Sequence, residues 1–153
     1  MTRVFAMALL AGLLLPPAAH ATEAKPSPYA GDWLAPAEDA DDVDAIITLT
    51  QQGPVWHGHI KQILPQSPNK KITDSTLCDA CKGPQHGRPY RGLEVMWDLQ
   101  ETTGKLNAGQ ILDPGDGQVY QCDVQLLADG KLQVRAYKGL PFLGHTMTWT
   151  RAR

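Results

Sequence analysis

The cysteines are the residues of this 153-residue sequence whose type and spacing most directly suggest chemistry. Cys78 and Cys81 form a C-x-x-C pair, which can close a disulfide, bind a metal or exchange disulfides with another thiol. Proteins that exchange disulfides through a C-x-x-C usually carry it at the start of a helix in a βαβ unit, and the sequence lacks an alternation of strands and helices. We therefore favour a structural disulfide between Cys78 and Cys81, with metal binding and redox activity as alternatives, and a buried free thiol at Cys122.

Two other clusters carry groups that bind metal ions. His57 and His59 form an H-x-H on one face of a predicted strand, a spacing that suits zinc or copper, and His86 could add a ligand. The acidic run of residues 38–44 offers the oxygen ligands of calcium, but its order does not match an EF-hand loop. We favour solvent-facing histidines and a solvated loop, and we predict neither a metal site nor a cofactor.

Catalytic motifs are absent from the sequence. It lacks a G-x-S-x-G, an H-E-x-x-H and a phosphate-binding glycine loop. Glu94, Asp98 and Asp123 lie in predicted strands, where carboxylates more often point outward than converge. We predict that the protein is not an enzyme. A pair of carboxylates that converges with a histidine in a cavity would argue against this prediction.

Eight strand-like segments position these groups, and helical periodicity is weak. Apolar and polar residues alternate with a period of two, as in residues 44–50, and strong turn signals such as Asp113 to Gly117 and Asp129-Gly130 separate the segments. The segments are residues 29–34, 44–50, 55–63, 91–100, 106–113, 119–128, 132–137 and 144–151. We predict an all-β domain that closes into an eight-stranded antiparallel barrel, with a two-sheet sandwich as the alternative.

Residues 64–89 differ from the rest of the chain. They contain four prolines, the polar run Asn69-Lys70-Lys71 and the C-x-x-C pair. We expect a long crossover loop, with one helical turn around Asp74 to Cys81. A loop of this length in a compact domain usually has a role, such as a lid, a disulfide-pinned cap or a partner surface.

One aromatic and one basic residue favour closure of the barrel. Trp33 lies in the first predicted strand, within Gly31-Asp32-Trp33, and Arg151 lies in the last. Those strands are neighbours only if the sheet closes. The guanidinium would then cover the indole ring and gain about 0.5 to 2 kcal/mol from the cation–π contact.

The N-terminus predicts export to the periplasm. Residues 1–21 combine Arg3, a short apolar run and an Ala19-His20-Ala21 ending, as a Sec signal peptide does, and no segment is long enough to span a membrane. We expect an extended leader over residues 22–28 and one domain over residues 29–153. After cleavage 153 − 21 = 132 residues remain, with 13 basic and 16 acidic side chains, a net charge of −3. That balance lacks the basic patch that nucleic-acid binding requires.

Several motifs resemble those of a known bacterial family. They are Gly31-Asp32-Trp33, Arg91-Gly92-Leu93, the D-P-x-x-G-x-x-Y run from Asp113 to Tyr120, Val134 to Tyr137, and the L-G-x-T-x-x-W ending of residues 143–149. Together they resemble the family called domain of unknown function 2147 over nearly the whole exported chain. The resemblance implies a small exported protein with a lipocalin-like (calycin) barrel. Two residues depart from the pattern, Ala136 in place of a usual glycine and His145 in place of a common arginine.

A barrel of eight strands has room for packed side chains or for one small ligand. We predict a binding module for a small, partly apolar ligand, whose cavity walls include Trp56, Val95, Trp97, Tyr120 and Val134. The alternative is a structural or protein-interaction barrel with a filled interior that contacts a partner through residues 64–89. The sequence does not indicate an oligomeric state.

Overall fold

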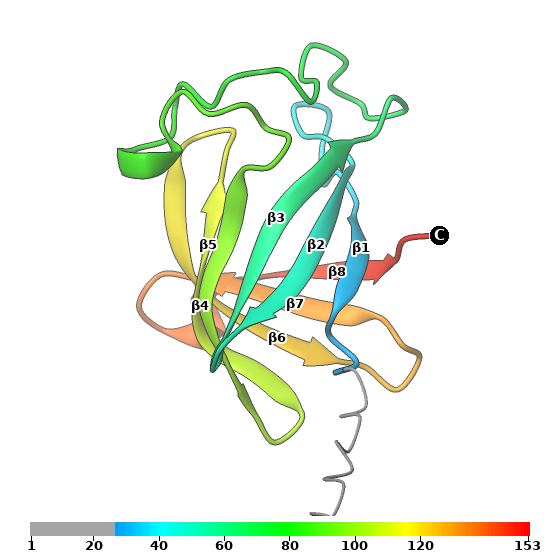
Figure 1. Ribbon diagram of the computed structural model, residues 1–153, viewed down its shortest axis with the longest axis vertical. Coiled ribbons are helices and arrows are strands. Elements are labelled where there is room, and N and C mark those ends of the chain that lie inside the picture. The colour runs from blue at the N-terminus through cyan, green and yellow to red at the C-terminus, as the bar shows by residue number, and fades with distance from the viewer. Residues whose placement is uncertain (1–26) are drawn as a thin grey trace, which may run out of the picture.

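The computed structural model describes residues 27–153 and shows a β-barrel capped at one end by loops (Figure 1). The predicted signal peptide of residues 1–21, and all but the end of the predicted leader, lie outside the described residues. Within residues 27–153, no helix has the length and apolar character that a membrane span needs.

Eight antiparallel strands form one closed barrel in chain order. They are β1 (Gly31–Ala35), β2 (Ala45–Gln52), β3 (Val55–Ile63), β4 (Glu94–Thr102), β5 (Lys105–Asp113), β6 (Gln118–Leu126), β7 (Leu132–Tyr137) and β8 (His145–Arg151). Pairing of Trp33 with Arg151 and of Leu34 with Thr150 joins β1 to β8 and closes the sheet. The predicted all-β barrel is confirmed, and a two-sheet sandwich is excluded.

The alternation of residue types explains which side of each strand faces the interior. In β2, Ala45, Ile47 and Leu49 are buried, whereas the residues between them are partly exposed. In β7, Leu132 and Val134 are buried in the same way. A closed sheet has one interior, so each strand contributes alternate side chains to a single core.

Strand β4 departs from the expected alternation. Val95 and Met96 are both buried, and Asp98 adopts a left-handed backbone conformation with φ 58°. The pairing of β3 with β4 shifts register at this point, as it does at a β-bulge. Trp97, expected on the same face as Val95, is instead half-buried. A bulge cannot be recognised from the period-two pattern, which it interrupts.

The end of the barrel near the start of β1 is filled with side chains. The Arg151 guanidinium lies over the Trp33 ring at 3.9 Å from the centroid, the arrangement that the sequence led us to expect. Arg151 also donates hydrogen bonds to the carbonyl oxygens of Ala30 (2.6 Å) and Pro28. The Trp33 indole donates to Tyr29 O at 2.8 Å, and the Tyr29 ring packs edge-on against Trp56 with centroids 6.1 Å apart. We call this part of the molecule the closed end.

Residues 64–89 form a cap over the opposite end of the barrel (Figure 1). The helical turn expected around Asp74 to Cys81 is wrong. Instead, a 3-10 turn spans Gly83–Gln85, and Leu77 pairs with Pro89 as an isolated β-bridge. Asp74 does not cap a helix because its carboxylate accepts a hydrogen bond from the Ile63 N–H at 2.6 Å and pairs with Arg91. The cap is thereby fastened to the end of β3 and to the segment that leads into β4.

Candidate ligand cavity

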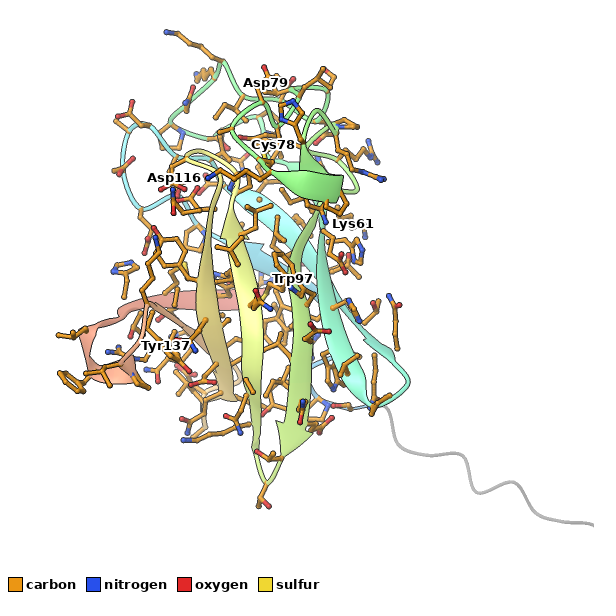
Figure 2. All side chains as sticks on the ribbon, turned by 90° about the vertical axis from the view of Figure 1, so that its left-hand side faces the viewer. Lys61, Cys78, Asp79, Trp97, Asp116 and Tyr137 are labelled. Atoms are coloured by element: carbon orange, nitrogen blue, oxygen red, sulfur yellow. A yellow bond between two sulfur atoms is a disulfide. The ribbon has the colours of Figure 1, made fainter. Side chains whose placement is uncertain are left out.

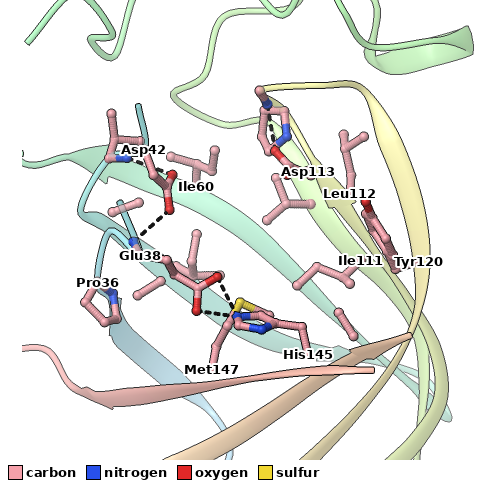
Figure 3. A pocket seen from close by; sticks show the side chains of 18 of the residues that line it. Pro36, Glu38, Asp42, Ile60, Ile111, Leu112, Asp113, Tyr120, His145 and Met147 are labelled. Carbon is pink, nitrogen blue, oxygen red and sulfur yellow. Dashed lines mark hydrogen bonds and ion pairs between the residues drawn. The ribbon is translucent and has the colours of Figure 1, made fainter. Parts of the chain in front are cut away.

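A cavity of about 500 Å³ lies in the capped half of the barrel (Figure 3). Its deep walls are apolar side chains from five strands. They are Ala45 and Ile47 of β2, Ile60 and Ile63 of β3, Val95 of β4, Ile111 and Leu112 of β5, and Met147 and Trp149 of β8. Ile72 and Tyr90 add to the lining from the segments between β3 and β4. The volume is within the range of about 300 to 1,000 Å³ that small-molecule sites occupy.

The mouth of the cavity is polar and mostly acidic. The β1–β2 loop contributes Glu38, Asp41 and Asp42, and Asp113 stands at the end of β5. The basic side chains at the mouth are Lys138, which follows β7, and His145, at the start of β8. Tyr120 and Tyr137 supply aromatic rings. The cavity is therefore amphipathic, with an apolar interior and a charged opening.

One ion pair joins two sides of the mouth. The His145 Nε2 lies 2.6 Å from Glu38 Oε1 and 2.7 Å from Oε2, which links the β1–β2 loop to β8 (Figure 3). Both side chains are exposed, 63% and 42% respectively, so the pair contributes at most about 1 kcal/mol to stability. The pair is therefore a weak link between the loop and β8 at the mouth.

The surroundings of Asp113, at the mouth, affect the ionisation of its carboxyl. Partial loss of hydration among the surrounding protein atoms raises the pKa of this carboxyl above its ordinary value. The negative charges of the nearby Asp116 and Asp42 raise the pKa further. The Gly115 N–H donates to Asp113 Oδ1 at 2.8 Å and partly offsets that effect.

Tyr90 lies under the cap and lines the same cavity, although its side chain is almost fully buried. Burial raises the pKa of its phenol, and Asp113 and Asp42 raise it further. The phenol therefore keeps its proton at neutral pH.

The β7–β8 connection forms an apolar lip beside the mouth. Leu140, Phe142 and Leu143 are 53%, 73% and 71% exposed, and Leu143 also lines the cavity. A short 3-10 turn, Pro141–Leu143, holds these side chains in place, and Arg135 Nε donates to Pro141 O at 2.6 Å.

The structure brings two of the five predicted wall residues to the cavity. Val95 and Tyr120 line it, whereas Trp56, Trp97 and Val134 do not. Trp56 is at the closed end, where its indole donates to Glu101 Oε2 at 3.0 Å, and Val134 is fully buried in the packed core. Trp97, labelled in Figure 2, is displaced from the interior by the bulge in β4.

Sequence reasoning missed Tyr90, Asp113 and His145 as residues of the cavity. Asp113 begins the D-P-x-x-G-x-x-Y run, so its place beside a motif was a usable signal. Tyr90 is flanked by Pro89 and Arg91 in a segment without periodicity, and no sequence pattern indicates that it points inward. His145 precedes Thr146 and Thr148 on a partly exposed strand and resembles a surface residue.

The predicted disulfide between Cys78 and Cys81 is confirmed, with the two Cα atoms 5.3 Å apart. Both half-cystines are buried in the cap, against the turn between β5 and β6. That turn contains Gly117, where an added Cβ would lie 1.9 Å from Ala80 O. Cys122 of β6 is a buried free cysteine, and burial raises the pKa of its thiol well above the ordinary value.

The histidines considered as metal ligands are engaged elsewhere. His57 Nδ1 lies 2.7 Å from Glu94 Oε1, and His59 Nε2 lies 3.9 Å from the same oxygen. His86 Nδ1 lies 3.0 Å from Cys81 O. Among residues 27–153, no three histidine, cysteine, aspartate or glutamate side chains group as a metal site requires. The acidic run of residues 38–44 is a loop whose carboxylates accept hydrogen bonds from its own backbone.

Comparison with known proteins supports the fold and identifies the family. No curated protein sequence matches this chain. A solved structure described as "Protein HP1028 from the human pathogen Helicobacter pylori belongs to the lipocalin family" is similar, with a TM-score of 0.70 over 82% of this chain and 83% of that chain. The sequence identity is 16%, so the similarity concerns the fold alone. The family model described as "Uncharacterized protein conserved in bacteria (DUF2147)" matches residues 31–151, and the chain belongs to this family.

Proposed function

We propose that this protein is a binding module for a small, partly apolar ligand, which it holds in the capped cavity without changing it chemically. The observation that carries the proposal is the cavity itself, with about 500 Å³ of space between apolar walls and a polar mouth. Apolar walls with a few convergent polar groups are the usual form of a small-molecule site. An apolar ligand would gain about 25 cal/mol for each Å² of surface that it buries there.

The cavity also bears on the alternative function. A structural barrel that contacts its partner through residues 64–89 is expected to have a filled interior, whereas this barrel has an open cavity in its capped half. Residues 64–89 pack inward with Ser67, Cys78 and Cys81, and Leu77 is their one large apolar side chain exposed to solvent. These features favour a cap over a partner surface.

We propose binding rather than catalysis, although a histidine and carboxylates meet at the mouth. Glu38 and His145 form the pair that could transfer protons, but their side chains are 42% and 63% exposed. General acid–base groups act best when a bound substrate is enclosed beside them. The pair lies at the rim, outside the enclosed apolar volume. We further propose that the protein acts in the periplasm, as the N-terminal sequence suggests.

The test is a matched pair of substitutions. Ala136 lines the cavity and Val119 lies on the neighbouring strand β6, 40% exposed and outside the cavity. Ala136→Trp should fill the space and weaken binding of the apolar dye N-phenyl-1-naphthylamine by roughly tenfold or more, as the loss of a few buried groups implies. Val119→Trp should bind the dye like the wild type. Equal binding by all three proteins, or no binding by any of them, would refute the proposal.

Native mass spectrometry complements the dye measurement. Protein purified from the periplasm of its own host should carry an additional mass that Ala136→Trp protein lacks. A mass retained equally by both proteins would place the ligand outside the cavity.

A further inference from the structure

The mouth of the cavity carries a negative charge that the residues lining it, all within the described part of the chain, do not neutralise. Four carboxylates line the cavity, those of Glu38, Asp41, Asp42 and Asp113, against the one ammonium of Lys138. With His145 neutral, the balance is 1 − 4 = −3. His145 is engaged by Glu38, so even its protonation would leave the other carboxylates in excess.

Two of these carboxylates have unused capacity to accept hydrogen bonds. Among residues 27–153, neither Asp42 nor Asp113 forms an ion pair. Asp42 accepts from the N–H groups of Val43 (2.7 Å) and Glu38 (3.2 Å), and Asp113 from that of Gly115 (2.8 Å). A carboxylate offers about four acceptor positions, so each retains free ones. Figure 3 shows Asp42 and Asp113 on opposite sides of the cavity.

Tyr90 adds a polar group on a buried residue that has no partner among the described residues. The residue is 5% exposed and lines the cavity, yet its hydroxyl makes no hydrogen bond with another residue of the described chain. Every fully enclosed side-chain oxygen or nitrogen in residues 27–153 has a partner, so this hydroxyl must reach open space. The hydroxyl is therefore available to accept a hydrogen bond from a ligand group or to donate one to it, although the rest of the residue is buried.

Aromatic rings complete an environment that suits a cation. Tyr120 and Tyr137 line the cavity, and the ammonium of Lys138 already lies over the Tyr120 ring, 4.7 Å from its centroid. Ring faces attract ammonium groups through their quadrupole, and nearby carboxylates strengthen that attraction. The Tyr120 ring is thus already covered by an ammonium of the chain, whereas among residues 27–153 no cation lies over the Tyr137 ring.

We propose that the ligand is an amphiphile with an ammonium group, bound with its apolar part inside the barrel and its ammonium near Asp42, Asp113 and Tyr90. This inference rests on the proposed function and gives it a ligand class. An ammonium could donate to a free position of the Asp42 or the Asp113 carboxylate, or to the Tyr90 oxygen, and the remaining carboxylates would attract it across the mouth, whereas a carboxylate ligand would be repelled there.

The inference can be tested with three probes that share one apolar chain. Decylamine, decanol and decanoate differ only in the polar group, so calorimetric titration of each into the wild type isolates the effect of charge. We expect decylamine to bind roughly tenfold or more tightly than decanol, as charge-assisted hydrogen bonds imply, and decanoate to bind most weakly.

Matched variants show which carboxylates cause the preference for decylamine. Asp42→Asn with Asp113→Asn should reduce the affinity for decylamine to that for decanol and leave decanol binding unchanged. Asp129→Asn removes a carboxylate from the β6–β7 turn, outside the cavity lining, and should change neither affinity. Unchanged decanol binding also shows that the double variant is folded.

The outcomes separate the two proposals. If decanol or decanoate binds as tightly as decylamine, or if the double variant keeps the preference for decylamine, the ammonium inference is wrong while the binding function stands. If none of the three probes binds, the proposed function fails together with the inference.

Discussion

Single residues in this barrel differ greatly in how strongly the protein changes their chemistry. Asp32 and Cys122 are the clearest cases, because one is stabilised as an anion and the other is kept neutral. Asp32 accepts hydrogen bonds from Lys61 and from Thr48 (2.6 Å), which lower the pKa of its carboxyl. Cys122 has no such partners, and burial in the core raises the pKa of its thiol.

Cys122 should therefore be unreactive in the folded protein. A thiolate is needed for alkylation, and a raised pKa with full burial removes both the thiolate and the access. We expect iodoacetamide at pH 8 to label no thiol in the native protein, one after unfolding, and three after unfolding with reduction, counted by mass spectrometry. Val119→Cys, an exposed position on the same strand, should label rapidly. Fast labelling of Cys122 in the folded state would contradict the burial described here.

Asp32 makes a pH-dependent contribution to stability. Its folded pKa is depressed, so the contribution is present above the ordinary value of 3.8 and is lost as the pH falls through the lower, folded value. Asp32→Asn removes the negative charge that the Lys61 ammonium and the Thr48 hydroxyl contact in the folded protein. We therefore expect the substitution to reduce the free energy of unfolding by about 1 kcal/mol at pH 7.

Urea denaturation at pH 7 and at pH 2.5 should measure this contribution. The difference between wild type and Asp32→Asn should shrink at the lower pH. Asp79→Asn, at an exposed aspartate without an ion pair among the described residues, is the control and should match the wild type at both values. If the stability difference between wild type and Asp32→Asn grew on acidification, the pKa of Asp32 would not be lowered in the folded protein.

At the scale of elements, the cap depends on contacts with the end of β3 and with residues just before β2 and β4. Asp74 bonds to the end of β3, the Tyr90 N–H donates to Thr76 O at 2.8 Å, and Ser67 Oγ accepts from the Asp44 N–H at 2.8 Å. The disulfide closes only a short loop, so it stabilises by roughly 2 kcal/mol through chain entropy. Its burial against the β5–β6 turn fixes where the cap sits.

Gly117 is the residue of that turn on which the cap rests. Its φ is 72°, and an added Cβ would lie 1.9 Å from Ala80 O, so Gly117→Ala combines backbone strain with a collision. Gly130 has a similar φ of 81° and nothing within 4 Å, so Gly130→Ala measures the strain alone. We expect about 1 kcal/mol of destabilisation for Gly130→Ala and at least about 1 kcal/mol more for Gly117→Ala.

Hydrogen exchange distinguishes the two substitutions further. Gly117→Ala should accelerate exchange in residues 77–90, because the cap must move away from the turn, while Gly130→Ala should leave this segment protected. Equal stability and equal exchange in both variants would mean that the cap does not rest on Gly117.

The elements were more predictable than the site. Alternation in β2, β3 and β7 and turn signals such as Asp129-Gly130 are local, so the strand bounds follow from the sequence to within a few residues. The cap has no period, and its form depends on distant contacts such as that of Asp74 with Ile63. Tyr90 reaches the cavity only because the cap folds in this way, which explains why no local pattern indicated it.

At the scale of the whole molecule, the barrel has two unlike ends. The closed end concentrates large side chains such as Trp33, Trp56 and Tyr29, and the capped end keeps its interior open. Strands β1 and β8 share few paired residues, so side-chain interactions must help to hold the seam. Gly31 allows this, since a Cβ there would lie 2.9 Å from Arg151 Nη1.

Arg151 should be the residue on which closure depends most. Arg151→Ala removes the cation–π contact with Trp33 and both carbonyl hydrogen bonds, and we expect a loss of roughly 1 to 2 kcal/mol. Arg153→Ala, two residues further on, should be near neutral. Thermal unfolding followed by circular dichroism measures both, and equal melting temperatures would contradict the role of Arg151. Dye binding at the far end should be unaffected by either change.

The sequence indicated that the barrel closes because the two residues that interact at the seam lie near the two ends of the domain. Trp33 and Arg151 belong to the first and last strands, and only a closed sheet can pair them. The presence of a cavity could not be predicted in the same way, because it depends on how completely side chains from all eight strands fill the interior. Trp56 and Tyr120 are similar residue types, yet one packs at the closed end and the other lines the mouth.

The hydrogen bonds from Arg151 to Pro28 and Ala30 have a practical consequence for how this protein can be handled. They fix residues 28 and 30 at the closed end, which faces away from the cavity. The C-terminus leaves from the side of the barrel, where Arg153 lies near Gln62 and Leu64 (Figure 1). A tether attached just before Ser27 would therefore leave the mouth pointing into solution, and the immobilised barrel should still admit its ligand, whereas coupling through Lys138 at the mouth would obstruct it.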